Sequence, residues 1–357
     1  MLFIRKLNCR LVLARIQGRW CTTEPTRHVP VMAKETIQFL KPRNNELFID
    51  MTFGAGGHTR EILKAAPSAK IIALDRDPVA HEMALALADK FPGQIYPILG
   101  WFSELPQKLE ELGIRQRSID GMIFDFGCSS MQFDEGSRGF SISKDGPLDM
   151  RMDKERCPDA PTAAEILAKI DEIDLARVLK IYGEEKHAKK IAGAIVEARN
   201  TIKKIETTKE LADLVQSCFG SDSFGLDKLK RPSHLATKTF QALRIFVNNE
   251  LNEINYGMVL AQHYLKIGGK MITITFHSLE DTIVKRHIMG NVLNDMANKL
   301  PLRYNSHIIC HEQEVMETVM KSPWHQLSKH VIVPTYEEVE DNPRSRSAKL
   351  RAVVLVD

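Results

Sequence analysis

Three glycines follow an aspartate near the start of the chain. Residues 50–63 read DMTFGAGGHTREIL, in which Asp50 precedes Gly54, Gly56 and Gly57. A backbone without Cβ atoms can approach a ligand closely, so this segment predicts a ligand-binding turn between a strand and a helix. The alternative is a glycine turn that serves only the packing of the strand against the helix.

The spacing of the glycines and the nearby carboxylates distinguish between possible ligands. The G-x-G-G pattern lacks the third glycine of the G-x-G-x-x-G dinucleotide turn, because Arg60 stands nearest to that position. Asp75 ends the next apolar run, where a carboxylate can accept both hydroxyl protons of a ribose. The charge of Asp50 would repel a diphosphate but suits a cation. These residues favour S-adenosylmethionine over NAD, the cofactor of a competing dehydrogenase hypothesis.

A further carboxylate, Asp125, closes an apolar run and is followed by Ser129 and Ser130. In a parallel sheet the carboxyl end of a strand faces the ligand crevice, so these groups would lie where a transferred group must sit. A single Asp at a strand end is also common as a helix cap or turn former. We expect the functional role here, because this strand flanks the predicted cofactor turn.

A sheet is needed to bring these residues together, and the apolar pattern predicts one. Apolar runs begin near residues 47, 70, 94, 121, 270, 331 and 349. Helical patterns separate the first four runs, and this alternation predicts parallel strands joined by right-handed crossovers. We therefore expect an α/β fold with a seven-stranded sheet that presents Asp75 and Asp125 at one edge.

The alternation stops between residues 134 and 233. Thr162 and Thr207 each precede a glutamate by three positions, which is the pattern of a capping box at a helix start. No convincing strand pattern occurs in this region, which we interpret as an inserted helical domain. The α/β domain would then comprise residues 26–133 and 234–357. Its second part opens with one long helical stretch, from about residue 235 to residue 265.

The first 23 residues contain five basic residues, no Asp or Glu, and apolar residues at helical spacing. This composition is typical of a mitochondrial transit peptide, which we assign to residues 1–25, and it predicts a location in the mitochondrial matrix. The alternative is a basic tail that binds nucleic acid. Without these residues acidic and basic side chains nearly balance, so any RNA contact depends on local clusters.

The composition favours neither a metal site nor a membrane protein. The six cysteines form no C-x-x-C pair, which argues against a zinc site and against a disulfide framework. No uninterrupted apolar run approaches the roughly 20 residues that cross a bilayer. We therefore expect neither a bound metal nor a membrane partner.

Long segments resemble the bacterial 16S rRNA cytosine-N4 methyltransferase family, with particular likeness to its mitochondrial branch. They are HVPVMAKETI (28–37), DMTFGAGGHTREIL (50–63), ALDRDP (73–78), DFGCSSMQ (125–132), RGFSISKDGPLDMRMD (138–153), HLATKTFQALRIFVNNELNEI (234–254), TFHSLEDTIVKR (275–286) and NPRSRSAKLR (342–351). The resemblance covers nearly everything from His28 to Arg351, although the stretch between Gly290 and Leu327 matches poorly.

The resemblance implies a Rossmann-like class I S-adenosylmethionine-dependent methyltransferase domain, interrupted by a helical substrate-recognition domain. It implies methylation of the exocyclic N4 of a cytidine in mitochondrial small-subunit (12S) rRNA, in support of small-subunit assembly. The alternative is a catalytically silent assembly factor that keeps the fold. The positions implied to bind the cofactor are Gly56, Gly57, His58, Asp75, Phe102 beside the adenine, and Asp125 and Gln132 near the methionine end.

The implied reaction needs acceptors for the amine protons more than a strong base, because the N4 lone pair is delocalised into the ring. Many amino-methyltransferases use an Asp/Asn/Ser-Pro-Pro-aromatic motif, whereas residues 125–128 read DFGC. We expect Asp125 or a neighbouring carbonyl to accept from N4, with His277 and Ser278 lining the same crevice. Cys128 offers a rival mechanism, thiolate addition to cytosine C6 and methylation of C5, but no His or Lys nearby in sequence would lower its pKa.

Clusters of basic residues are the candidates for RNA contact. They are Lys186, Lys189 and Lys190; Lys203 and Lys204; Lys228, Lys230 and Arg231; Lys285 and Arg286; and Arg344, Arg346, Lys349 and Arg351. Each cluster alone is more often a solvated face than a phosphate site. The last is the strongest candidate, because it holds four basic residues within eight positions and no acid. A cytidine flipped out of its stack would reach the crevice.

Overall fold

The computed structural model describes residues 30–153, 156–219, 225–226, 232–299 and 322–357. The predicted transit peptide lies outside these residues, as does the cluster of Lys228, Lys230 and Arg231. Among the helices that the structure describes, none is long and apolar enough to cross a membrane.

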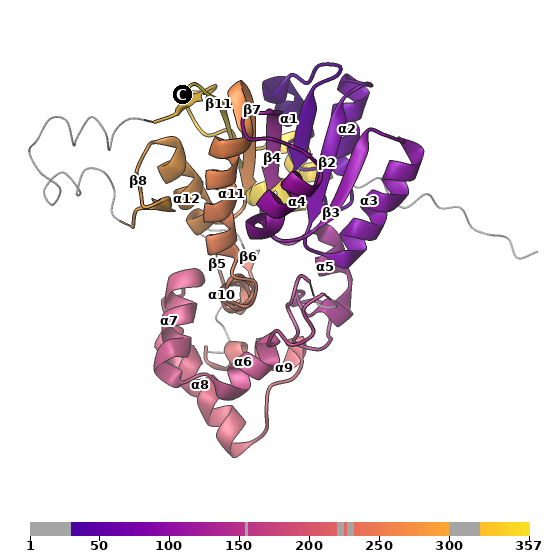
Figure 1. Ribbon diagram of the computed structural model, residues 1–357. Coiled ribbons are helices and arrows are strands. Elements are labelled where there is room, and N and C mark those ends of the chain that lie inside the picture. Colours follow the sequence, from indigo (N-terminus) through magenta and orange to yellow (C-terminus); the bar gives the residue numbers. More distant parts are fainter. Residues whose placement is uncertain (1–29, 154–155, 220–224, 227–231, 300–321) are drawn as a thin grey trace, which may run out of the picture.

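A seven-stranded sheet with the order β10-β11-β7-β4-β1-β2-β3 forms the centre of the α/β part (Figure 1). The parallel strands are β1 (Leu47–Asp50), β2 (Lys70–Asp75), β3 (Ile95–Leu99), β4 (Ile119–Asp125) and β7 (Leu265–Thr275). At one edge, β11 (Lys349–Leu355) and β10 (Trp324–Gln326) are antiparallel to their neighbours. The predicted α/β class and the predicted parallel run are confirmed.

Helices cover both faces of this sheet. One face packs against α1 (Ala33–Leu40), α2 (Gly57–Ala65) and α3 (Pro78–Lys90); the other packs against α4 (Leu105–Glu111), α11 (Glu250–Tyr264) and α12 (Ser278–Ile288). Successive residues of a strand point to opposite faces. In β4, Met122 and Phe124 therefore pack with α4, α11 and α12, whereas Ile123 packs with α1 to α3.

The strand expected at residue 331 is wrong. The seventh strand is β10, and Ile332 makes only an isolated antiparallel bridge to Leu350 of β11. Gln326 pairs with Val353 farther along the same edge, so the bend between Gln326 and Ile332 shifts the register. The edge of the sheet beside β11 is thus formed by the more polar strand β10, and the apolar run at 331–334 adds only the bridge of Ile332.

The long helical stretch expected at 235–265 is two helices, α10 (Thr237–Val247) and α11. Asn249 between them has a left-handed backbone, with φ 50°, and this conformation cannot continue a right-handed helix. The side chain of the preceding Asn248 donates to the carbonyl of Met150 at 2.7 Å and accepts from the amide of Met152 at 2.8 Å. The break is therefore held in place by a distant segment of the chain.

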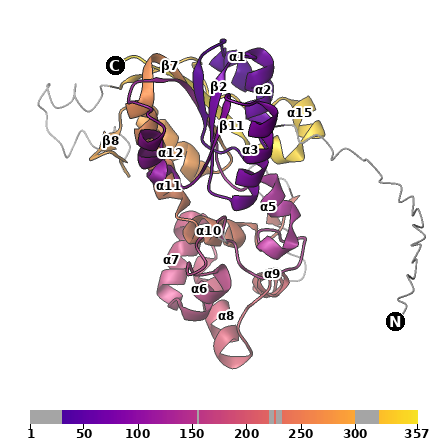
Figure 2. The ribbon, with the colours of Figure 1, turned by 45° about the vertical axis from the view of Figure 1, so that its right-hand side comes forward.

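A second, helical part lies below the sheet in both views (Figures 1 and 2). It comprises α6 (Ala163–Lys169), α7 (Glu172–Tyr182), α8 (Ala188–Thr201) and α9 (Thr208–Ser217), and both predicted capping boxes are present. Its apolar core also takes in Phe240 and Leu243 of α10, packed with Leu179 and Ile191. The division of the chain at residues 134 and 233 stays a prediction. α10 follows residue 233 in the sequence but packs with the helical part.

The remaining short elements lie around these two parts. They are α5 (Ser130–Asp134), the paired strands β5 (Gly225–Leu226) and β6 (Pro232–Ser233), β8 (Val292–Leu293) and β9 (Met296–Ala297), the helix α15 (Tyr336–Asp341), and the 3-10 turns η1 (Phe102–Glu104), η2 (Gly136–Arg138) and η3 (Pro343–Ser347). The pairing of β5 with β6 was not expected, because each strand has only two residues.

Candidate functional site

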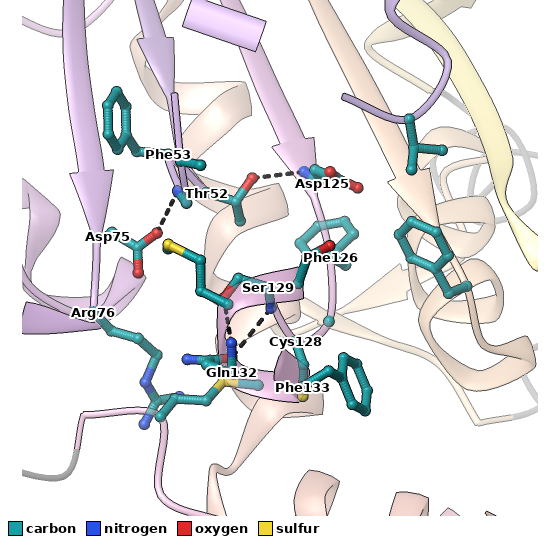
Figure 3. A pocket seen from close by; sticks show the side chains of 18 of the residues that line it. Thr52, Phe53, Asp75, Arg76, Asp125, Phe126, Cys128, Ser129, Gln132 and Phe133 are labelled. Atoms are coloured by element: carbon teal, nitrogen blue, oxygen red, sulfur yellow. Dashed lines mark hydrogen bonds between the residues drawn. The ribbon is translucent and has the colours of Figure 1, made fainter. Parts of the chain in front are cut away.

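A cavity of about 600 Å³ opens at the carboxyl ends of the parallel strands. Figure 3 shows Asp75, at the end of β2, and Asp125, at the end of β4, on either side of Thr52. The predicted site residues that line it are Gly57, His58, Asp75, Phe102, Asp125 and Gln132. The fold thus brings together residues that are separated by up to 75 positions in the printed sequence.

The glycine turn is bare because neighbouring side chains leave no space for a Cβ atom. Gly56 precedes α2 with a φ of 74°, and a Cβ there would lie 2.5 Å from the ring of Phe53. A Cβ on Gly57 would lie 2.8 Å from the side chain of Pro30. Gly56 itself does not line the cavity but sets the path of the turn that does.

Asp75 joins the glycine turn to the end of β2. Its Oδ2 accepts from the amide of Gly54 at 2.7 Å, and its Oδ1 accepts from the amide of Asp77 at 2.9 Å. Burial is the largest influence on this carboxyl group and raises its pKa to about 6. Each oxygen still has a lone pair available toward the cavity, as a ribose contact requires.

Asp50 does not line the cavity, contrary to the expectation that it suits a bound cation directly. Its side chain is buried, and it accepts hydrogen bonds from the hydroxyl of Thr59 at 2.7 Å and the amide of Thr52 at 3.3 Å. It fixes the start of α2 against β1, and burial is the largest influence on its carboxyl group and raises its pKa.

His58 and Asp125 face one another at the centre of the site. Nε2 of His58 lies 3.7 Å from Oδ2 of Asp125, and the imidazole is 4% exposed. Burial opposes protonation of His58, but the carboxylates of Asp125 and Asp50 outweigh it and raise its pKa above the usual value. The amide of Asp125 donates to the hydroxyl of Thr52 at 2.7 Å, which orients the carboxylate (Figure 3).

An aromatic cluster forms the wall beside Phe102. The ring of Phe102 lies edge-on to Phe124, with centroids 5.8 Å apart, and next to Phe126 at 6.3 Å. Glu253 of α11 holds the turn in front of this ring, because its carboxylate accepts from the amide and the hydroxyl of Ser103 at 3.1 and 2.9 Å. This wall offers an apolar face to a flat ring.

Trp101 is a cavity residue that the sequence reasoning did not find. Two guanidinium groups lie over its indole, Arg76 at 5.2 Å and Arg156 at 5.7 Å from the ring centroid. Its Nε1 donates to Asp153 at 2.5 Å, and Arg76 donates to the other oxygen of Asp153 at 3.3 Å. The available signal was Arg76 between the two aspartates of ALDRDP, but its stacking partner lies in a different segment.

Gln132 lies in the wall with both ends of its amide already engaged. Nε2 donates to Asp77 at 2.8 Å, and Oε1 accepts from the amide of Ser129 at 3.1 Å in a capping box that starts α5 (Figure 3). Asp77 in turn pairs with Arg138. Gln132 therefore fixes the path of α5 along the cavity.

His277 and Ser278 are not among the residues that line the cavity; Phe276 lines it from the end of β7 instead. Nδ1 of His277 accepts from the amide of Leu279 at 3.3 Å and caps α12. The hydroxyl of Ser278 donates to Glu184, in the helical part, at 2.6 Å. The structure thus does not bring these two predicted residues together with Asp125.

Cys128 lines the cavity, but its surroundings disfavour a thiolate. Burial is the largest influence and raises its pKa to about 12. The nearby cation, Arg244, is engaged by Glu250 at 2.8 and 2.9 Å and by Glu280 at 3.3 Å. A thiol that remains protonated is a weak nucleophile, so thiolate addition to cytosine C6 is disfavoured.

Most of the last basic cluster is neutralised by acids from elsewhere in the chain. Arg351 donates to Asp281 at 2.8 and 3.2 Å, Lys349 lies 3.5 Å from the same carboxylate, and Arg344 donates to Asp134 at 2.6 Å. Other members of the predicted basic clusters form no ion pair with a described residue; they are Arg346, Lys186, Lys189, Lys190, Lys204, Lys285 and Arg286. No group of three or more His, Cys, Asp or Glu in the described part of the chain could hold a metal ion.

Known proteins match most of the chain. A relative from Culex quinquefasciatus, which carries the name of a receptor-type tyrosine-protein phosphatase (mosPTP-1), is 78% identical over 95% of this chain. The chain spans only 23% of that longer protein, so its name says nothing about this chain. A Drosophila melanogaster relative, named as a methyltransferase-like protein 15 homolog, is 58% identical and matches over 93% of both chains. The human 12S rRNA N(4)-cytidine methyltransferase METTL15 is 45% identical over 96% of this chain and 86% of its own.

A protein-family model also covers nearly the whole chain. The model described as the MraW methylase family matches residues 25–355. This range contains the sheet, the helical part and every residue that lines the cavity, from Pro30 to Ser347. The chain therefore belongs to the MraW methylase family.

Proposed function

We propose that this protein transfers a methyl group from S-adenosylmethionine to the exocyclic N4 of a cytidine in small-subunit rRNA. The observation that carries the proposal is the convergence of the bare glycine turn, Asp75, Phe102 and Asp125 on one cavity. The name of the human relative, a 12S rRNA N(4)-cytidine methyltransferase, supports the choice of atom and RNA. The opposing hypothesis of a dehydrogenase lacks support in the glycine spacing.

The residues that line the cavity suit the cofactor. Asp75 would accept from the ribose hydroxyls, and Phe102 would lie against the adenine. The turn set by Gly56, which lines the cavity through Gly57 and His58, would follow the methionine part. The carboxylates of Asp75 and Asp125, with Asp50 behind them, would lie near the positively charged groups of the cofactor. When bound, S-adenosylmethionine supplies a methyl group on a positively charged sulfur.

Asp125 is the group that receives the amine in this proposal. Its Oδ1 has no hydrogen-bond partner among the described residues, although it is buried, and its backbone is held by Thr52. An oriented acceptor restrains N4 and favours the tetrahedral nitrogen that forms during transfer. His277 and Ser278 contribute indirectly: by starting α12 and by binding Glu184, they fix the strand end that carries Phe276.

The helical part would bind the RNA in this proposal. Lys186, Lys189 and Lys190 are exposed at the start of α8, where phosphate contacts would position the strand without reading its sequence. A flipped cytidine would then enter the cavity between the helical part and the sheet. Given the pattern of residues 1–25, the place of action would be the mitochondrial matrix, on the assembling small subunit.

The decisive experiment incubates the purified protein with S-adenosylmethionine and unmethylated small-subunit rRNA or subunits. We expect N4-methylcytidine in the digested nucleosides, resolved from C5-methylcytidine by mass spectrometry. Asp125→Asn should lose the methylation rate even at saturating cofactor, with its cofactor affinity measured separately by calorimetry. A normal rate in Asp125→Asn would contradict the role of this residue, and cofactor binding without any methylation would support the silent assembly factor instead.

A further inference from the structure

His58 is a buried imidazole with no hydrogen-bond partner on either ring nitrogen among the described residues. It lines the same cavity as Asp125, whose Oδ1 is also without a partner, and its Nε2 lies 3.7 Å from Oδ2 of Asp125. Leaving buried polar atoms unpaired costs about 1 to 3 kcal/mol for each group. Such a cost is expected where the missing partner is a ligand or a reacting group.

Methylation of N4 leaves a proton that must be removed. N4 forms a bond to the methyl carbon with its lone pair, the carbon–sulfur bond breaks with its electron pair on sulfur, and the nitrogen then carries one proton too many. In this arrangement the carboxylate of Asp125 restrains N4 by accepting a hydrogen bond from it. A neutral imidazole beside it can accept the proton at physiological pH, because the usual histidine pKa lies in this range.

We propose that Nε2 of His58 accepts the proton released from N4, while Oδ1 of Asp125 holds the amine. This inference rests on the proposed function and adds to the cofactor contact that the resemblance implies for His58. The imidazolium formed would be stabilised by the carboxylate of Asp125 at 3.7 Å and by the buried Asp50 behind it. The proton thereby stays within the site until the product leaves.

The charged groups that face His58 determine the direction of its pH dependence. They are Asp125 at the end of β4, Asp50 at the end of β1, Glu61 on the same helix and Glu338 of α15. All four are carboxyl groups, and the raised pKa of His58 follows from the nearest of them despite its burial. Only the neutral imidazole can accept a proton, so the methylation rate should rise with pH through the pKa of His58.

The test compares wild-type protein with His58→Gln in single-turnover methylation at saturating cofactor and RNA, from pH 5.5 to pH 8.5. We expect His58→Gln to lose about a hundredfold in rate at pH 8, which is the low end of general-base contributions. The loss is at the low end because the protonated N4 product is acidic and can also release its proton to water. His58→Gln should also lose the decline toward acidic pH. His325→Gln, on the exposed edge strand β10, is the matched control and should match wild type.

A second measurement does not depend on activity. Titration of the His58 imidazole by NMR should give a midpoint above 6.5 that falls in Asp125→Asn, and this midpoint should coincide with the acidic decline of the wild-type rate. A His58→Gln protein that keeps the wild-type rate at saturating cofactor, with the acidic decline intact, would overturn the inference. So would a titration midpoint unrelated to that decline, even if His58→Gln fails to fold. A wild-type protein that forms no N4-methylcytidine would contradict the proposed function itself.

Discussion

Nη1 of Arg138 donates to both carboxylate oxygens of Asp77, at 3.3 and 3.0 Å, where the two side chains are 7% and 3% exposed. Asp77 follows β2 and caps α3, while Nη2 of Arg138 donates to the carbonyl of Met152 at 2.7 Å. The pair therefore ties the strand end that carries Asp75 to the loop that runs toward the helical part. Loss of either partner should therefore destabilise both the end of β2 and this loop.

Arg138→Met should lower the free energy of unfolding by about 3 to 5 kcal/mol, because it leaves the buried carboxylate of Asp77 without its cation. Urea unfolding followed by circular dichroism measures this loss. Arg177→Ala removes an exposed ion pair with Asp174 and serves as the control, with no resolvable change in midpoint. Equal effects of the two substitutions would show that the buried pair contributes no more than a surface pair.

Gly56→Ala should destabilise the protein more than Gly93→Ala, although both glycines have a φ near 75°. The left-handed backbone costs a residue with a Cβ about 1 to 2 kcal/mol at either position. Only at Gly56 does the Cβ meet another group, the ring of Phe53 at 2.5 Å, whereas nothing lies within 4 Å at Gly93. Thermal unfolding measures the difference, and calorimetry should show weaker cofactor binding for Gly56→Ala alone. Identical thermal shifts would argue against the close contact with Phe53.

Cofactor affinity should fall as the pH drops through about 6, because burial raises the pKa of Asp75 to about 6 and the ribose contact needs the carboxylate. The carboxyl group of Asp75 is almost fully ionised at pH 8, and its ionised fraction falls about tenfold for each pH unit well below the pKa. Calorimetry with adenosine, which carries the ribose but no amino acid amine, isolates this group. Asp75→Asn should bind weakly with no dependence in this range. A pH-independent affinity in wild type would place the ribose away from Asp75.

Arg346→Ala should weaken rRNA binding and reduce the slope of log affinity against log salt by about 1, as expected for one phosphate contact. Arg351→Ala is the matched control, because Arg351 is already bound by Asp281. That variant should lose stability, since it leaves Asp281 with only Lys349, but should keep the salt slope. Filter binding across a salt series distinguishes the two. Equal slopes for Arg346→Ala and wild type would remove Arg346 from the RNA surface.

The positions of Asp75 and Asp125 could be predicted because they depend on local patterns. An apolar run that ends in an aspartate, repeated with intervening helices, places each carboxylate at the same edge of a parallel sheet. Both line the cavity, as does His58 after the glycines. The resemblance added Phe102 and Gln132, which pattern alone does not distinguish from ordinary core or loop residues.

Features that depend on distant partners could not be predicted in this way. The helix break at Asn249 needs Met150 and Met152, which lie about a hundred residues earlier in the chain. The last basic cluster contains no acid in its own segment, yet Asp134 and Asp281 reach it from other elements. His277 and Ser278 follow a strand end, as a site residue would. However, the side chain of His277 caps a helix, and the hydroxyl of Ser278 binds Glu184.

The placement of the helical part between two neighbouring strands has a consequence for synthesis. β4 pairs with β1 on one side and with β7 on the other, but β7 is made only after the whole helical part. Until then the emerging chain carries β4 as an open edge of a half-built sheet, a surface prone to wrong pairing. The helical part buries its own apolar core together with α10, so its folding does not require the completed sheet. We therefore expect closure of the sheet to be a late folding step, with the unpaired edge of β4 most open to wrong pairing before β7 is made.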